Sequence, residues 1–159
     1  SMLSNDQLKA ELIADNIHVH QAVMKILYKC KGKDSICLIS DCMRAGGLED
    51  GEYTLGELDI RVKDSIARTE SGSLAGSTLR LIDAVKNMVE LVGVDLSAAI
   101  QMAALNPARL LGVDDQLGSI KEGKKANLVV LDDSYQVMMT IINGRVVYQA
   151  NNFELAERS

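Results

Sequence analysis

The chain has 159 residues, of which 47% are hydrophobic and 25% charged, and its formal net charge is -5. These values predict a globular protein with a hydrophobic core. The acidic balance argues against nucleic acid as a partner, because phosphate binding needs a basic surface. The sequence has no run of about 18 apolar residues, so no membrane-spanning helix is expected. A polar N-terminus without a signal peptide and three cysteines without zinc-ligand spacing predict a cytoplasmic protein whose cysteines are core thiols.

A strand, a helix and a second strand are expected in the first 40 residues. An apolar stretch at 11–14 precedes a helical pattern over 21–31, and Gly32 is expected to end that helix. The apolar positions of the helix at i, i+3, i+4 and i+7 are Val23, Ile26, Leu27 and Cys30. A second apolar strand follows at 36–40. This order is typical of a parallel βαβ unit.

Polar residues follow both of these strands. Parallel strands end at the same edge of a sheet, so Asp15, His18 and Asp41 are expected to gather there. An acid at the carboxyl end of a buried strand is a common place for a catalytic group, which makes Asp41 the first catalytic candidate. The alternatives are a carboxylate that caps the following turn and, for His18, a structural histidine with satisfied hydrogen bonds.

The middle of the chain predicts a small sheet and then helices. Glycines punctuate residues 44–72, which are expected to form an inserted β-hairpin or meander. A helix is expected over 78–91, with Ser77 as its N-cap and Gly93 beyond its end. Two further helices are expected, one after the N-cap Asp95 and one opening at Asn106-Pro107 and ending at Gly112.

The end of the chain returns to β-structure. An apolar strand at 128–131 and a hairpin of 137–142 with 145–148 across Asn143-Gly144 are predicted. Lys121, Lys124 and Lys125 are expected in a solvated turn, and 151–159 in a loose tail.

The fold class predicted is α/β, the last βα units of a (β/α)8 barrel followed by part of a small β-sandwich domain. A complete barrel needs about 250 residues. The expected division is therefore an incomplete barrel at 3–115 with the insertion at 44–72, then a β-sandwich segment at 116–150. Open strand edges predict association with the remainder of a barrel or with further copies.

Four stretches resemble the N-acetylglucosamine-6-phosphate deacetylase family of the amidohydrolase superfamily. They are IADNIHV at 13–19, LISD with Ala45-Gly46 at 38–46, SLAGST at 73–78, and the closing signature NPARLLG with LGSIKEGKKANLVVLD at 106–132. The resemblance runs from about residue 12 to 147. It implies hydrolysis of N-acetylglucosamine 6-phosphate to glucosamine 6-phosphate and acetate, with a divalent metal, zinc by expectation, in the complete enzyme.

The resemblance also implies roles for individual residues. Asp41 would be the general base and then the acid that protonates the leaving amine. His18 would bind the acetyl carbonyl or sugar hydroxyls. The remaining substrate-contacting positions implied are Asp15, Asn16 and Ile17 beside His18, and Leu74, Ala75 and Gly76 in a loop that closes over the sugar, which could otherwise be a plain glycine-serine turn.

Departures from the family pattern limit the expected activity. The family's metal ligands lie on earlier strands, so no metal site is expected in this chain, although His18 and His20 form an H-x-H pair of the kind that binds metal in other amidohydrolases. The isolated chain is therefore expected to be inactive. Asn16 stands where the family usually has Gly, and Asn127 where it usually has Asp. The alternatives are a non-catalytic truncated paralogue that binds a partner or self-associates, and a different amidohydrolase such as a dihydroorotase-like cyclic amidase.

Overall fold

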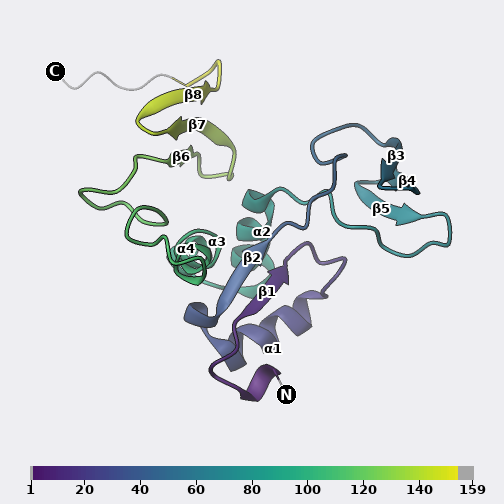
Figure 1. Ribbon diagram of the computed structural model, residues 1–159, viewed down its shortest axis with the longest axis horizontal. Coiled ribbons are helices and arrows are strands. Elements are labelled where there is room, and N and C mark those ends of the chain that lie inside the picture. The colour runs from purple at the N-terminus through teal and green to yellow at the C-terminus, as the bar shows by residue number, and fades with distance from the viewer. Residues whose placement is uncertain (1, 154–159) are drawn as a thin grey trace. The chain divides into compact units, whose positions relative to one another are not determined.

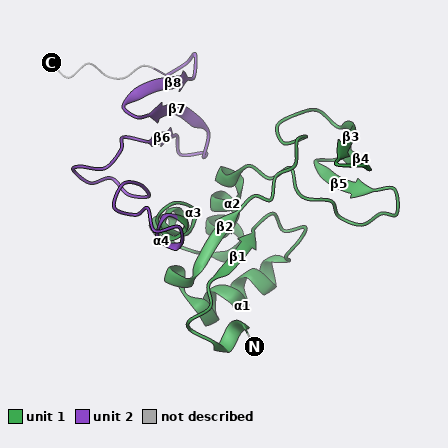
Figure 2. Cartoon of the chain, in the orientation of Figure 1, with its two compact units in different colours: residues 1–107 green, residues 108–159 purple. Residues whose placement is uncertain are grey.

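The computed structural model describes residues 2–153, so most of the predicted tail lies outside the described residues. The chain forms two compact units, Ser1–Pro107 and Ala108–Ser159 (Figure 2). In the part of the chain that is described, no helix is both long enough and apolar enough to span a bilayer.

The first unit is built on two short parallel strands, β1 (Ala10–Ile13) and β2 (Ile36–Ile39), shown side by side in Figure 1. Their register pairs Ala10 with Ile36 and Ile13 with Ile39, so both strands end at the same level. The helix α1 (Gln21–Lys31) connects them, as the sequence predicts. The sheet stays two-stranded, so the described residues form a mixed α/β unit and no closed barrel.

The helix α1 begins and ends as predicted but buries a different face. Gly32 has φ 63° and donates its N–H to the carbonyl of Tyr28, which ends the helix. The buried positions are Met24, Leu27 and Lys31, whereas Val23 and Ile26 are both 53% exposed and Cys30 is exposed. Apolar residues occupy two neighbouring faces of this helix, and the face with Met24 packs in the core cluster that also contains Leu12 and Leu38.

Short helical segments complete the first unit. They are the 3-10 turns η1 (Met2–Ser4) and η2 (Lys33–Ser35), α2 (Leu81–Asn87), the π-helical turn η3 (Met88–Val92), α3 (Leu96–Ala103) and the beginning of α4 (Leu105–Leu110), which continues into the second unit. Asp95 caps α3 and Gly93 with φ 82° ends η3, both as predicted. The core contains the fully buried side chains Met24, Leu38, Met88 and Met102, so methionine fills much of this interior.

Two predicted helix caps are wrong. The helix α2 begins after Arg80, so Ser77 lies outside it and serves another purpose described below. Asn106 lies inside α4 and is 5% exposed. Its amide Nδ2 donates to the carbonyls of Lys33 at 2.6 Å and Ile36 at 2.7 Å. Asn106 therefore satisfies backbone groups 70 or more positions earlier in the chain instead of capping its own helix.

The predicted inserted meander is confirmed. It consists of β3 (Gly51–Leu55), β4 (Leu58–Lys63) and β5 (Ile66–Thr69) in an antiparallel sheet. Alternation along these strands buries one face, on which Ile60, Val62 and Ala67 pack with Met43, Ala45 and Ala75. The meander is thus attached to the segments that follow β2 and precede α2.

The second unit is a three-stranded antiparallel sheet of β6 (Leu128–Leu131), β7 (Val137–Ile142) and β8 (Arg145–Gln149). Asn143 and Gly144 have φ values of 50° and 76°, which are typical of the predicted hairpin turn. Every residue of β8 is exposed. Lys124 departs from the solvated turn expected of it, because its ammonium donates to Ser119 Oγ at 2.7 Å and to the carbonyl of Leu117 at 3.1 Å.

The three cysteines are free, but only one is a core thiol. Cys37 is buried in β2, where burial raises the pKa of its thiol and the nearby Glu11 carboxylate adds to the effect. Cys30 and Cys42 are exposed. The expectation of three core thiols is therefore wrong for these two: Cys30 lies on the exposed side of α1, and Cys42 is an exposed residue beyond the end of β2.

Candidate active site

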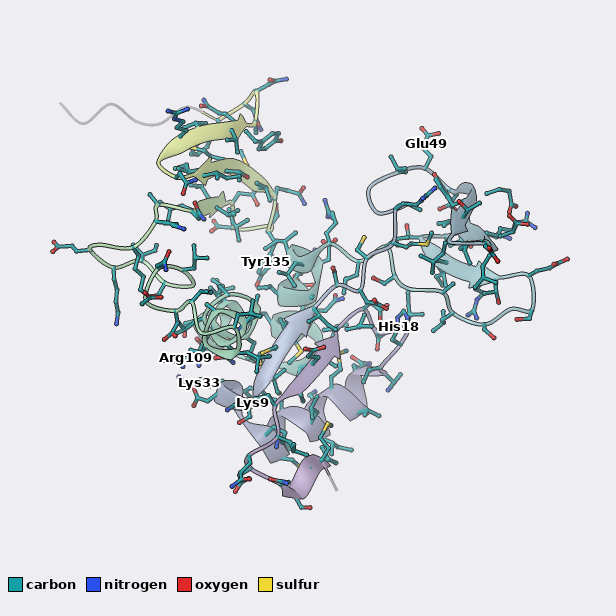
Figure 3. The ribbon with its side chains drawn as sticks, viewed as in Figure 1. Lys9, His18, Lys33, Glu49, Arg109 and Tyr135 are labelled. Atoms are coloured by element: carbon teal, nitrogen blue, oxygen red, sulfur yellow. The ribbon has the colours of Figure 1, made fainter. Side chains whose placement is uncertain are left out.

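The strands β1 and β2 end at the same level, and the predicted site residues Asp15, His18 and Asp41 follow these ends. Ile13 pairs with Ile39, and Asp15 and Asp41 each follow by two positions. Figure 3 shows His18 on the loop that leaves β1, on the side of the sheet where both strands end. The parallel register therefore places both acidic residues at the same edge of the sheet, as the βαβ pattern predicts.

Asp15 and His18 form one interlocked pair. Asp15 Oδ2 lies 2.6 Å from His18 Nδ1, and Asp15 Oδ1 accepts the backbone N–H groups of Ile17 at 2.9 Å and His18 at 2.8 Å. Burial by itself would raise the pKa of Asp15, but the hydrogen bonds from the His18 ring and from these two N–H groups outweigh it and lower the pKa below 3.8. Asp15 is thus a carboxylate at neutral pH.

Asn16 and Ile17 shape the loop around this pair. Asn16 has φ 62°, in the left-handed region that favours Gly and tolerates Asn. Its Oδ1 accepts the N–H of Gln21 at 2.8 Å, which ties the loop to the first turn of α1. His20 Nδ1 accepts the N–H of Ala22 at 3.2 Å in the same turn, as expected of a residue at a helix start. Ile17 is 41% exposed.

Asp41 sits on a special backbone position with its side chain exposed. Its φ is 47°, and its carbonyl accepts the N–H of Ser77 at 2.8 Å. Ser77 also accepts the N–H of Met43 at 2.8 Å through its carbonyl, so the chain on both sides of Asp41 is fastened to the loop before α2. A carboxylate that is exposed, on a backbone held in place by hydrogen bonds, is accessible for proton exchange with a ligand.

The loop at 73–80 is built around a buried serine. Ser77 is 4% exposed; its Oγ donates to the carbonyl of Ser40 and accepts the N–H of Leu79 at 3.1 Å. Gly76 has φ 67°, and a Cβ on it would lie 3.2 Å from the carbonyl oxygen of Asp41. Ala75 is buried, while Leu74 and Gly76 are partly exposed. This loop is therefore a structured element and more than a flexible glycine-serine turn.

A pocket of about 490 Å³ lies beside this edge. It is lined by five of the predicted residues, namely Asp15, Ile17, His18, Leu74 and Gly76. Asn16, Ala75 and Asp41 are not among its lining residues. Hence the loop after β1 and the loop before α2 line one pocket together, and Asp41 is not among the residues that line it.

Sequence reasoning missed a charged pair in the same pocket. Arg80 donates to Asp83 through Nε at 2.7 Å and through Nη2 at 2.8 Å, and both residues line the pocket. The i, i+3 spacing of opposite charges was a readable signal for the pair. Nothing in the sequence indicated that it would face the loop containing His18, because that depends on the packing of α2.

The donor set of the described residues does not fit a metal ion held by them alone. Among residues 2–153, no three His, Cys, Asp or Glu side chains come together in a way that could bind a metal ion. The H-x-H pair is also divided, since His18 Nδ1 meets Asp15 and His20 Nδ1 accepts a helix N–H. Any metal would need ligands from outside the described residues.

Comparisons with known proteins agree with the motifs. The Amidohydrolase family model matches residues 6–147. An Escherichia coli protein provisionally named N-acetylgalactosamine-6-phosphate deacetylase is 48% identical over 91% of this chain and 86% of its own length. A second Escherichia coli protein with that name, without the qualification, is 48% identical over 91% of the chain and 38% of its own length. The N-acetylglucosamine-6-phosphate deacetylase of Vibrio furnissii is 42% identical over 88% of this chain and 35% of its own length.

Solved structures give the same result. The N-acetylglucosamine-6-phosphate deacetylase of Thermotoga maritima matches with a TM-score of 0.88 and 42% identity, over 93% of this chain and 40% of that one. A mutant of the Mycobacterium smegmatis N-acetyl-D-glucosamine-6-phosphate deacetylase, in complex with N-acetyl-D-glucosamine-6-phosphate, matches with a TM-score of 0.86 and 32% identity, over 92% of this chain and 39% of that one. The chain thus spans about 40% of the solved relatives. It belongs to the amidohydrolase family, in the branch that contains the amino-sugar 6-phosphate deacetylases.

Proposed function

We propose that this chain carries the acid–base and substrate-contacting part of a deacetylase that hydrolyses an N-acetylhexosamine 6-phosphate to the amino sugar and acetate. The observation that carries the proposal is the shared edge of β1 and β2, where Asp41 and the Asp15–His18 pair follow strands that end in register. The 48% identity to a named deacetylase supports the same reaction.

Asp41 is the proposed proton carrier. A carboxylate accepts a proton as water attacks the acetamide carbon, and it then gives that proton to the amine, which leaves poorly without one. The exposed side chain of Asp41 leaves it accessible for this exchange. His18 would bind the sugar, and the partly exposed Leu74 and Gly76 would contact it from the loop before α2. In the complete enzyme a divalent metal ion, zinc by expectation, would polarise the amide.

The isolated chain is proposed to be inactive, because its described residues do not assemble a metal site. Its partners would be the remainder of a barrel and further copies of itself, which would cover the open edges of β1 and β2. Three free cysteines support a reducing, cytoplasmic setting. Light scattering tests self-association, and a strictly monomeric species would contradict it.

Different observations support each of the two candidate substrates. The motifs point to N-acetylglucosamine 6-phosphate, whereas the two Escherichia coli relatives at 48% identity are named for the galactosamine compound, the C4 epimer. Both sugar phosphates are therefore substrates to compare. A second function, a non-catalytic binding module, is favoured by one observation: an Escherichia coli relative is matched over 86% of its length, so a relative of similar size exists.

The test uses a chimera in which this chain replaces the matching part of the Thermotoga maritima enzyme, whose corresponding segment superposes with a TM-score of 0.88. We expect the chimera to release acetate from one or both sugar phosphates, and the chain alone to release none. Asp41→Asn should lower kcat about 100-fold or more, the range for loss of general acid–base catalysis. Asp133→Asn, an exposed carboxylate of the second unit, is the matched control. A folded chimera that is unaffected by Asp41→Asn would overturn the assignment.

A further inference from the structure

The loop after β1 holds a carboxylate that makes three hydrogen bonds within the protein. Asp15 Oδ1 accepts two backbone N–H groups, and Oδ2 meets the His18 ring at 2.6 Å. The Asp15 side chain is 7% exposed and that of His18 is 19% exposed. Asp15 is therefore poorly placed to bind a ligand directly, although it lines the pocket.

The direction of the hydrogen bond between these side chains follows from their chemistry. An ionised carboxylate only accepts, so the proton in the 2.6 Å contact must sit on His18 Nδ1. When the ring is neutral, Nε2 then carries no proton and is an acceptor. Because Nδ1 is occupied by Asp15, Nε2 is the ring nitrogen that remains for a ligand.

His20, two residues further on, has the reverse arrangement. Its Nδ1 accepts the N–H of Ala22 at 3.2 Å, so this nitrogen carries no proton and the neutral ring is protonated on Nε2. The chain contains only these two histidines. They are expected to be opposite tautomers within one loop, which provides an internal reference for any measurement on His18.

We propose that Asp15 is a positioning residue that holds His18 in the Nδ1–H tautomer and presents Nε2 to the pocket as a hydrogen-bond acceptor. A ligand must then offer a donor at that point. A sugar hydroxyl or the acetamide N–H of an amino sugar supplies one, whereas the acetyl carbonyl is itself an acceptor and would not bind there. This assigns Asp15 a role through His18 in place of direct sugar contact. The identity of the ligand rests on the proposed deacetylase function; the tautomer does not.

The experiment is nitrogen-15 NMR of the imidazole rings in the whole 159-residue chain, at a pH where both rings are neutral. The expected spectrum has a protonated Nδ1 and an unprotonated Nε2 for one ring, and the opposite pattern for the other. A His20→Gln variant, which loses only an exposed cap residue, assigns the signals. If His18 is protonated on Nε2 in the unaltered chain, the proposal is overturned without any further variant.

The variant Asp15→Asn makes the test sharper because it keeps the shape of the side chain. The amide oxygen can still accept the N–H groups of Ile17 and His18, but the amide NH₂ now faces the ring and donates. His18 should therefore switch to the Nε2–H tautomer while His20 does not change. A folded variant that keeps His18 as Nδ1–H would overturn the proposal.

A control and an activity measurement separate this proposal from the proposed function. Asp83→Asn alters the other paired carboxylate of the pocket and should leave both tautomers unchanged. In the chimera, Asp15→Asn should raise KM for the sugar phosphate more than it lowers kcat, since an acceptor becomes a donor at the binding site. A chimera without deacetylase activity but with the expected spectra would reject the function and keep the positioning role.

Discussion

Gly76 packs so closely against the backbone of Asp41 that a side chain at this position would force its neighbours to shift. A Cβ on Gly76 would lie 3.2 Å from the carbonyl oxygen of Asp41, and the same oxygen accepts the N–H of Ser77 at 2.8 Å. The loop before α2 and the end of β2 are therefore one structural element. The proposed proton carrier depends for its position on a loop that follows it by more than 30 residues.

Gly76→Ala should destabilise the first unit by about 2 kcal/mol, from the left-handed backbone at φ 67° and from the tight contact together. Gly72→Ala is the matched control, because Gly72 also has a positive φ of 87° but has nothing within 4 Å of an added Cβ. That variant should lose only about 1 kcal/mol. Urea unfolding of both variants measures the difference, and equal losses would show that the contact with Asp41 has no cost.

Ser77→Ala should cost about 1–3 kcal/mol of unfolding free energy, since it leaves the carbonyl of Ser40 and the N–H of Leu79 without their Oγ partner. Ser71→Ala removes an exposed hydroxyl from the neighbouring turn and should change stability by less than about 0.5 kcal/mol. Thermal unfolding monitored by circular dichroism compares them. Similar melting temperatures for the two variants would contradict the structural role of Ser77.

Asn106→Ala should cost about 2 kcal/mol or more, because two backbone carbonyls near β2 lose the same buried donor. Asn106→Asp should be worse, since it places a second set of acceptors against those carbonyls. Asn152→Ala, at an exposed position after β8, is the control. Urea midpoints rank the three variants, and an aspartate variant as stable as the original chain would refute this reading of the hydrogen bonds.

Because of the Asp15–His18 pair, the free energy of unfolding should depend on pH in the acid range. The pKa of Asp15 is lower in the folded protein than its ordinary value of 3.8. The contribution of this carboxylate is therefore fully present above pH 3.8 and is lost as pH falls through the lower folded pKa. Urea unfolding from pH 6 to pH 2 should show Asp15→Asn less stable than the original chain at pH 6, with the difference shrinking below pH 3.8. A constant difference across this range would contradict the assignment.

Local patterns predicted most of the secondary structure. The strands near 11–14 and 36–40, the three-stranded insertion and the Asn143-Gly144 hairpin all form within a residue or two of their expected positions. These elements are encoded in alternation, glycine placement and turn chemistry, which act between residues close in sequence. The shared edge carrying Asp15 and Asp41 followed from the βαβ order, because parallel strands must end on the same side.

Site details that involve distant segments were not predictable in this way. The pairing of Asp15 with His18 is local in sequence, but the presence of Arg80 in the same pocket depends on how α2 packs. Asn106 resembled a helix cap because Asn before Pro commonly is one, yet its amide is used by carbonyls 70 or more residues away. A pattern read over a few residues contains no information about such partners.

The sequence by itself determined the order and type of the elements, the edge at which Asp15, His18 and Asp41 follow their strands, and membership of a recognisable family. Only the tertiary structure decided which face of α1 is buried, how Ser77 and Gly76 hold the backbone of Asp41, and which ring nitrogen of His18 remains for a ligand. The physical reason is the range of the interactions. Periodicity and turn preferences act between neighbours in the chain, whereas burial and buried hydrogen bonds are set by whichever residues folding brings together.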